Sequence, residues 1–169
     1  ISAGISPVKK LMDAGIPVAL GTDSAYSNNT LDMFEAMKVG SLLQKVATGD
    51  PTVLPAGTCV RMATIEGAKI LGIDDKVGSI EEGKLADIIL VDFSEPHLQP
   101  WYPKCPENVL SHLVYCAKGG DVSAVIIDGK VVMKDRQVMS LDQQSVIENS
   151  QKAAADILWD AGLKQFFGE

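Results

Sequence analysis

The sequence predicts an α/β protein in which the end of a barrel-like α/β unit leads into a smaller β-rich unit. Residues 1–72 alternate helical patterns with a short, uninterrupted apolar run, whereas the chain from Lys76 onward is richer in strand patterns. The pair Asp128-Gly129 lies between two β-rich runs, and such a pair is a strong hairpin signal. These observations together predict two structural parts of different character.

The first part is expected to contain four helices and one buried strand. Ser6 caps the first helix, Pro7 occupies its first position and Gly15 ends it. The apolar run 17–21 is typical of a parallel strand that is buried on both faces. A polar loop over residues 24–30 follows, and further helices are expected at about 31–46, 55–62 and 64–72.

The second part is expected to begin with strands at 77–80 and 86–93, separated by a turn at 81–84. A proline-rich connector leads to a helix over about 108–118, and the hairpin occupies residues 122–133. Asp142 caps a last amphipathic helix that runs to about Lys164. We therefore divide the chain into three segments, 1–75, 76–141 and 142–169.

Composition excludes several classes of protein. The net charge is −7 and no lysine or arginine cluster is present, so a nucleic-acid groove is not expected. No apolar run approaches the roughly 18 residues that a membrane span needs. Three distant cysteines without a C-x-x-C spacing argue against a disulfide scaffold and favour a reducing, cytoplasmic environment. Because the chain begins with Ile1 rather than methionine, we expect a fragment of a longer protein or a processed product.

Asp23 is the leading candidate for chemistry. It directly follows the expected buried strand, and catalytic groups of βα-barrels lie at the carboxyl ends of the strands. Its carboxylate could bind a divalent metal and accept a proton from water, although aspartates in βα loops are also common as caps or turn residues.

Ser27 and Asn28 follow closely and could bind substrate at the same end of the expected barrel. The alternative is a polar loop in which Asn29 or Thr30 caps the next helix.

The two histidines, His97 and His112, do not complete a metal site by spacing. Catalytic zinc sites use about three protein ligands, and these residues form neither a His-x-His nor a His-Glu-x-x-His pattern. A lone histidine in a helix, such as His112, is more often a packing or capping residue. Cys59, Cys105 and Cys116 are expected to be small buried apolar residues.

Several motifs in order carry a resemblance to the amidohydrolase superfamily, nearest to its S-adenosylhomocysteine/5′-methylthioadenosine deaminases and chlorohydrolase-like proteins. The resemblance covers nearly the whole chain. The motifs are Leu20-Gly21-Thr22-Asp23, Ser27-Asn28-Asn29, Leu31-Asp32-Met33-Phe34, Met62-Ala63-Thr64, Val77-Gly78-Ser79-Ile80, Pro96-His97 and Ser111-His112-Leu113. The resemblance implies the last βα units of a metal-dependent hydrolase TIM barrel (1–75), the C-terminal strands of its composite β-sandwich (76–141) and a C-terminal helix (142–169).

The resemblance also implies a reaction. A divalent metal, usually zinc, activates a water molecule that attacks a ring carbon bearing an amino group. Asp23 would be a metal ligand and would carry the water proton to the leaving ammonia. The substrate would be a nucleoside-like small molecule, such as S-adenosylhomocysteine or methylthioadenosine. A guanine or cytosine deaminase, a triazine-type chlorohydrolase and a non-catalytic association module remain the alternatives.

The family's metal-site histidines and catalytic glutamate lie upstream of Ile1, so the resemblance leaves Asp23 without its partners. We expect the fragment alone to bind no metal and to be inactive, and to need the N-terminal part of the same protein. Open sheet edges favour pairing with another chain, so a homo-oligomer is expected, without a membrane or nucleic-acid partner.

Overall fold

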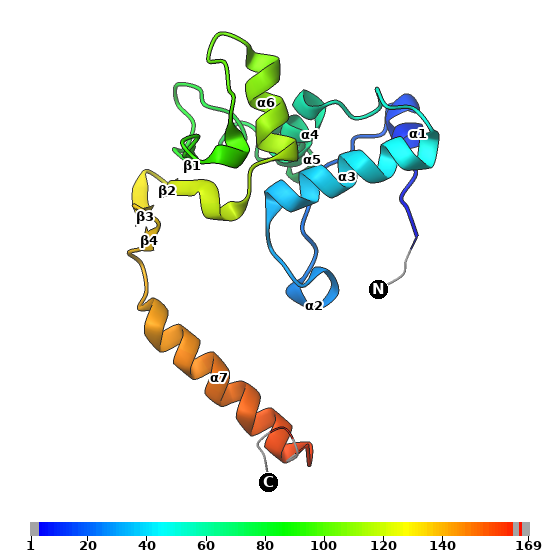
Figure 1. The fold of residues 1–169 in the computed structure, drawn as a ribbon. Coiled ribbons are helices and arrows are strands. Elements are labelled where there is room, and N and C mark those ends of the chain that lie inside the picture. Colours follow the sequence, from blue (N-terminus) through cyan, green and yellow to red (C-terminus); the bar gives the residue numbers. More distant parts are fainter. Residues whose placement is uncertain (1–3, 164–165, 167–169) are drawn as a thin grey trace.

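A computed structural model describes residues 4–163 and 166 (Figure 1). It contains helices and one antiparallel sheet, which confirms the α/β class. In chain order the described elements are α1 (Val8–Asp13), α2 (Ala25–Asn28), α3 (Met33–Thr48), α4 (Ala56–Met62), α5 (Ile65–Leu71), β1 (Ile88–Val91), η1 (Pro96–Leu98), α6 (Pro106–Tyr115), η2 (Gly119–Asp121), β2 (Val122–Ile127), β3 (Lys130–Lys134), β4 (Gln137–Val138) and α7 (Gln143–Asp160).

Helix α3 begins at its cap and ends at a glycine. The Asp32 side chain accepts hydrogen bonds from the Phe34 and Glu35 amides, and Gly49 closes the helix with φ of 68°. Capping by Asn29 or Thr30 was therefore wrong, because only Asp32 immediately precedes the first helical residue. The buried residues of α3 recur at intervals of three or four positions and form one face: Phe34, Met37, Ser41 and Gln44.

Two predicted strands are unpaired in the described chain. Residues 17–21 are extended but belong to no sheet in the described chain, where the Leu20 amide donates to the Met62 carbonyl at 3.1 Å. Residues 77–80 form bends within a loop that is closed by the Leu85 amide and the Lys76 carbonyl. A strand exists only when a neighbouring strand takes up its hydrogen bonds, and apolar character alone does not supply that neighbour.

The predicted hairpin is confirmed. Strands β2 and β3 pair antiparallel, with Ile127 opposite Lys130, and both turn residues, Asp128 and Gly129, have positive φ. This is the type I′ arrangement that matches strand twist. The sheet order is β1-β2-β3-β4, all antiparallel. The short strand β4 was not predicted.

One hydrophobic core joins the helical segment to the sheet-bearing segment. Cys59 and Met62 on α4 belong to the same buried cluster as Leu98 in η1 and Val114 on α6. The last two side chains are fully buried. A polar contact crosses the same boundary, because the buried Ser41 hydroxyl donates to the Leu54 carbonyl and lies 2.8 Å from the Tyr115 hydroxyl.

Helix α7 extends away from the rest of the molecule (Figure 1). Asp142 caps it as predicted, accepting from the Gln144 and Ser145 amides. The helix has no buried residue and ends at Asp160, and the predicted end at Lys164 lies outside the described residues. Of the helices in the described part of the chain, none combines the length and the apolar character that crossing a bilayer requires.

Candidate functional site

Asp23 follows segment 16–22, which has no regular secondary structure and packs against α3. A methyl group added at Gly40 on α3 would lie 3.1 Å from Leu20 Cδ2, so the segment packs closely against that helix. The bond between the Leu20 amide and the Met62 carbonyl fixes its other side to the end of α4. Segment 16–22 is therefore held in place on two sides, and Asp23, which follows it, is exposed.

The backbone at Asp23 adopts the left-handed conformation, with φ of 58°. Aspartate is one of the few non-glycine residues that tolerate this conformation, which ordinarily costs roughly 1–2 kcal/mol. The Thr22 hydroxyl contacts the Asp23 carbonyl at 3.1 Å, and the Ser24 amide donates to Asp23 Oδ1 at 2.7 Å. An unfavourable backbone held by local bonds is a feature of functional sites.

Ser27 and Ser24 surround the Asp23 carboxylate with donors. The Ser27 hydroxyl, followed by the Ser24 amide, holds the pKa of the Asp23 carboxyl below its usual range. The two serine hydroxyls lie 3.1 Å apart, since helix α2 brings Ser27 back over Ser24 by one turn. The structure thus brings Asp23 and Ser27 together, and the carboxylate is ionised at neutral pH.

The Asn28 side chain bonds to the backbone of its own loop. Its side-chain amide donates to the Thr30 carbonyl at 3.3 Å, within the same loop. The following residue, Asn29, ends α2 with φ of 65°. In this conformation Asn28 holds the loop, which is one of the two roles that its sequence position suggested.

The two histidines have partners of their own. His97 Nε2 lies 2.9 Å from Asp121 Oδ2, and His112 Nε2 lies 2.8 Å from the Pro100 carbonyl. Within residues 4–163, no three histidine, cysteine or acidic side chains are close enough together to hold a metal ion. Asp23 belongs to no such group, so the described residues do not by themselves form a three-ligand metal site around it.

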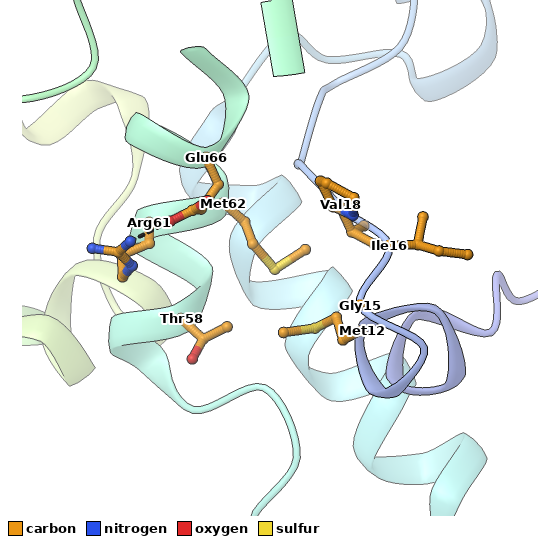
Figure 2. A pocket seen from close by; sticks show the side chains of 9 residues that line it. Met12, Gly15, Ile16, Val18, Thr58, Arg61, Met62 and Glu66 are labelled. Carbon is orange, nitrogen blue, oxygen red and sulfur yellow. Dashed lines mark hydrogen bonds and ion pairs between the residues drawn. The ribbon is translucent and has the colours of Figure 1, made fainter. Parts of the chain in front are cut away.

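A cavity of about 410 Å³ lies beside the first residues of segment 16–22 (Figure 2). Asp23 comes after the last residue of that segment. The lining of the cavity is mainly apolar, with Met12 and Met62 facing each other across it, and an ion pair between Arg61 and Glu66 at the rim. Asp23 is not part of this lining, so the cavity is not the candidate metal site.

Asp32 is a residue of this region that sequence reasoning missed. Its position before a helical pattern is a capping signal, but its second carboxylate oxygen accepts from the Gly119 amide at 2.9 Å. No local pattern could have indicated a partner 87 residues away.

The chain belongs to the Amidohydrolase family, whose sequence profile matches residues 1–132. It is 46% identical over 158 residues to the 5-methylthioadenosine/S-adenosylhomocysteine deaminase of Desulforudis audaxviator, covering 94% of this chain and 36% of that protein. It is 48% identical over 158 residues to the 5′-deoxyadenosine deaminase of Methanosarcina mazei, covering 94% and 35% respectively. The chain thus spans about a third of the length of these curated relatives.

The fold is also similar to that of an adenosine deaminase from Xanthomonas campestris, which was solved with bound zinc. The TM-score is 0.86 at 37% sequence identity, over 92% of this chain and 34% of that protein. The resemblance to the amidohydrolase superfamily and to its adenosine-type deaminases is therefore confirmed.

Proposed function

We propose that this chain is the C-terminal part of a metal-dependent aminohydrolase that deaminates an adenosine-type nucleoside, S-adenosylhomocysteine or methylthioadenosine. The observation that carries the proposal is the ionised, exposed Asp23 carboxylate, held in a left-handed backbone at the end of a supported segment. The names of the relatives support the substrate class, because both describe deaminases of 5′-substituted adenosine compounds.

In this proposal, residues 1–75 are the last βα units of a (β/α)8 barrel. Residues 76–141 supply sandwich strands, and residues 142–169 a C-terminal helix. The extended segment 16–22 is then a barrel strand whose neighbours lie in the N-terminal part of the protein. Its position against α3 and the apolar cavity beside it support this assignment.

Asp23 acts as a metal ligand and as the proton carrier of the reaction. A bound zinc or other divalent ion would lower the pKa of its water towards neutrality. The Asp23 carboxylate accepts a proton from the attacking water and delivers it to the leaving amino group. Only the ionised form can ligate a metal or accept a proton, and the hydrogen bonds from Ser27 and Ser24 that lower the pKa of the carboxyl favour that form. Ser27 orients the carboxylate, and Ser27 and Asn28 border the substrate.

The remaining ligands come from the N-terminal part of the same protein, and the fragment alone is inactive. Exposed apolar side chains on α7, such as Ile157 and Val146, support association with another copy or with that missing part. A guanine or cytosine deaminase, a triazine-type chlorohydrolase and a non-catalytic association module are the competing assignments.

The test is a chimera that joins the part of the Desulforudis audaxviator deaminase outside the match to this chain. With zinc, we expect ammonia release from methylthioadenosine, S-adenosylhomocysteine or 5′-deoxyadenosine, much less ammonia release from guanine or cytosine, and little chloride release from atrazine. Asp23→Asn should abolish the ammonia release, whereas Asp13→Asn, at an exposed ion pair with Lys9, should not. Activity of the 169-residue chain alone, or an active Asp23→Asn chimera, would contradict the proposal.

A further inference from the structure

We propose that Asp32 is a positioning residue that ties the loop carrying Asp23 to the turn Lys118–Asp121 of the sheet-bearing segment, and so fixes the Asp23 carboxylate for the metal. The loop is residues 22–32. This inference rests on the proposed function, because it assigns to Asp32 an effect on the same metal site.

The two oxygens of the Asp32 carboxylate have separate partners. Oδ1 accepts from the Phe34 amide at 2.8 Å and the Glu35 amide at 3.4 Å, which is all that capping α3 requires. Oδ2 accepts from the Gly119 amide at 2.9 Å. The second bond is not part of the helix cap. It joins two segments that are 87 residues apart in the sequence.

The turn that receives Asp32 is itself fixed. Asp121 is nearly buried, and its Oδ2 accepts from the Lys118 amide at 2.9 Å and contacts His97 Nε2 at 2.9 Å. The Asp121 carbonyl accepts from the Asp92 amide at the end of β1. Asp32 is therefore bonded to a point that is anchored to both the sheet and the connector.

The loop between Asp23 and Asp32 is internally bonded over most of its length. Ser24 contacts Ser27 and Asn28 donates to Thr30 within the loop, and the Thr30 hydroxyl bonds the end of the loop to helix α3 by donating to Glu35 Oε2 at 2.6 Å. A loop with such bonds moves largely as a unit, so its position depends on how its ends are held. The segment before Asp23 holds one end, and Thr30 and Asp32 hold the other.

Loss of the Asp32–Gly119 bond should therefore shift Asp23 without unfolding α3. Asparagine caps helices as well as aspartate does. Its amide group has only one acceptor oxygen, so Asp32→Asn cannot serve both the cap and Gly119. Partners beyond the direct ligands typically change metal affinity or activity by about 10- to 100-fold.

Two neighbouring glycines provide a matched pair of steric probes. A Cβ at Gly119 would lie 3.2 Å from Asp32 Oδ2, so Gly119→Ala has to displace that oxygen. A Cβ at Gly120 would meet nothing within 4 Å, and neither glycine has the left-handed φ that would strain an alanine. Asp142→Asn supplies a further control, because Asp142 caps α7.

The experiment places these four substitutions in the chimera described above. Zinc affinity is measured by competition with a chromophoric chelator, together with kcat, KM and the midpoint of thermal unfolding. We expect Asp32→Asn and Gly119→Ala to weaken zinc binding and lower kcat about tenfold or more, with KM within about twofold. Gly120→Ala and Asp142→Asn should bind zinc and turn over as the unmodified chimera does.

A purely structural role would lower the unfolding midpoint and leave zinc affinity and kcat unchanged, and that result would overturn the inference. Equal effects of Gly119→Ala and Gly120→Ala would also overturn it. An unmodified chimera that binds zinc without deaminating contradicts the proposed function alone, and the zinc affinities then still decide on Asp32. A chimera that binds no zinc contradicts both.

Discussion

Truncation of Leu98 should destabilise the helical segment and the sheet-bearing segment together. Leu98 lies in the 3₁₀ turn η1 and is fully buried in the cluster that includes Cys59 and Met62 on α4 and Val114 on α6. A leucine in this position belongs to the connector by sequence, but it contributes to a core that α4 and α6 share.

The size of the effect follows from the burial. Leu98→Ala removes three buried carbon groups, which corresponds to a transfer free energy of about 2.4 kcal/mol. The cavity left behind adds to this, because a packed core relaxes only in part, and measured values for such changes are about 2–5 kcal/mol. We therefore expect a loss of about 3 kcal/mol. Leu141→Ala, at a side chain that is 52% exposed, should cost less than about 1 kcal/mol.

Urea unfolding of the 169-residue chain, combined with hydrogen exchange, measures both the size and the reach of the effect. In Leu98→Ala, amide protection should fall in α3 and α4 as well as in α6 and β2. The reasoning would be refuted if only residues after 76 lost protection while the helices before 76 kept theirs. A cost below about 1 kcal/mol would refute it as well.

Two further predictions follow from the structure. Gly78→Ala should destabilise the chain more than Gly83→Ala, as measured by urea unfolding. Both residues have positive φ, but only at Gly78 would the new Cβ clash, because it would lie 2.8 Å from Ala68 Cβ. At Asp121, burial raises the carboxyl pKa, but hydrogen bonds from His97 and the Lys118 amide outweigh it and the pKa is lowered. Its stabilisation should therefore persist above the unfolded-state pKa of about 3.9 and disappear as the pH falls further. The stability difference between wild type and Asp121→Asn should shrink below that pH, and a difference that grows on acidification would contradict the assignment.

Most helices were predictable because their signals are local, although the four-residue helix α2 lies where a polar loop was expected. Pro55 before α4, Gly72 after α5 and Asp142 before α7 each mark a helix end within a few residues of sequence. The hairpin was predictable for the same reason, since Asp128-Gly129 defines its own turn. The strands predicted at 17–21 and 77–80 are unpaired in the described chain, because pairing depends on a second segment, which an apolar run does not reveal.

Some features of the candidate site were likewise predictable from local sequence, and others were not. The position of Asp23 after an apolar run was visible in the sequence, and the neighbouring Ser27 was close enough to be included with it. The left-handed backbone of Asp23 and the bond from Asp32 to Gly119 were not visible, because one is a conformation and the other a contact across 87 residues. Local sequence thus indicated which residue could bind a metal, but not what holds it in place.

The surface around Asp23 gives a physical reason to expect a partner at this loop. Tyr26 on α2 is 89% exposed and Leu31, at the other end of the loop, is 67% exposed. A single exposed apolar side chain is ordinary, but these two lie on either side of Asp23 in the sequence, and Asp23 belongs to no group of three or more potential metal ligands among the described residues. A segment that buried Tyr26 and Leu31 would lie against the same loop as Asp23. Burial of these side chains and completion of the ligand set are then expected in one step, so zinc should bind only when that segment is present.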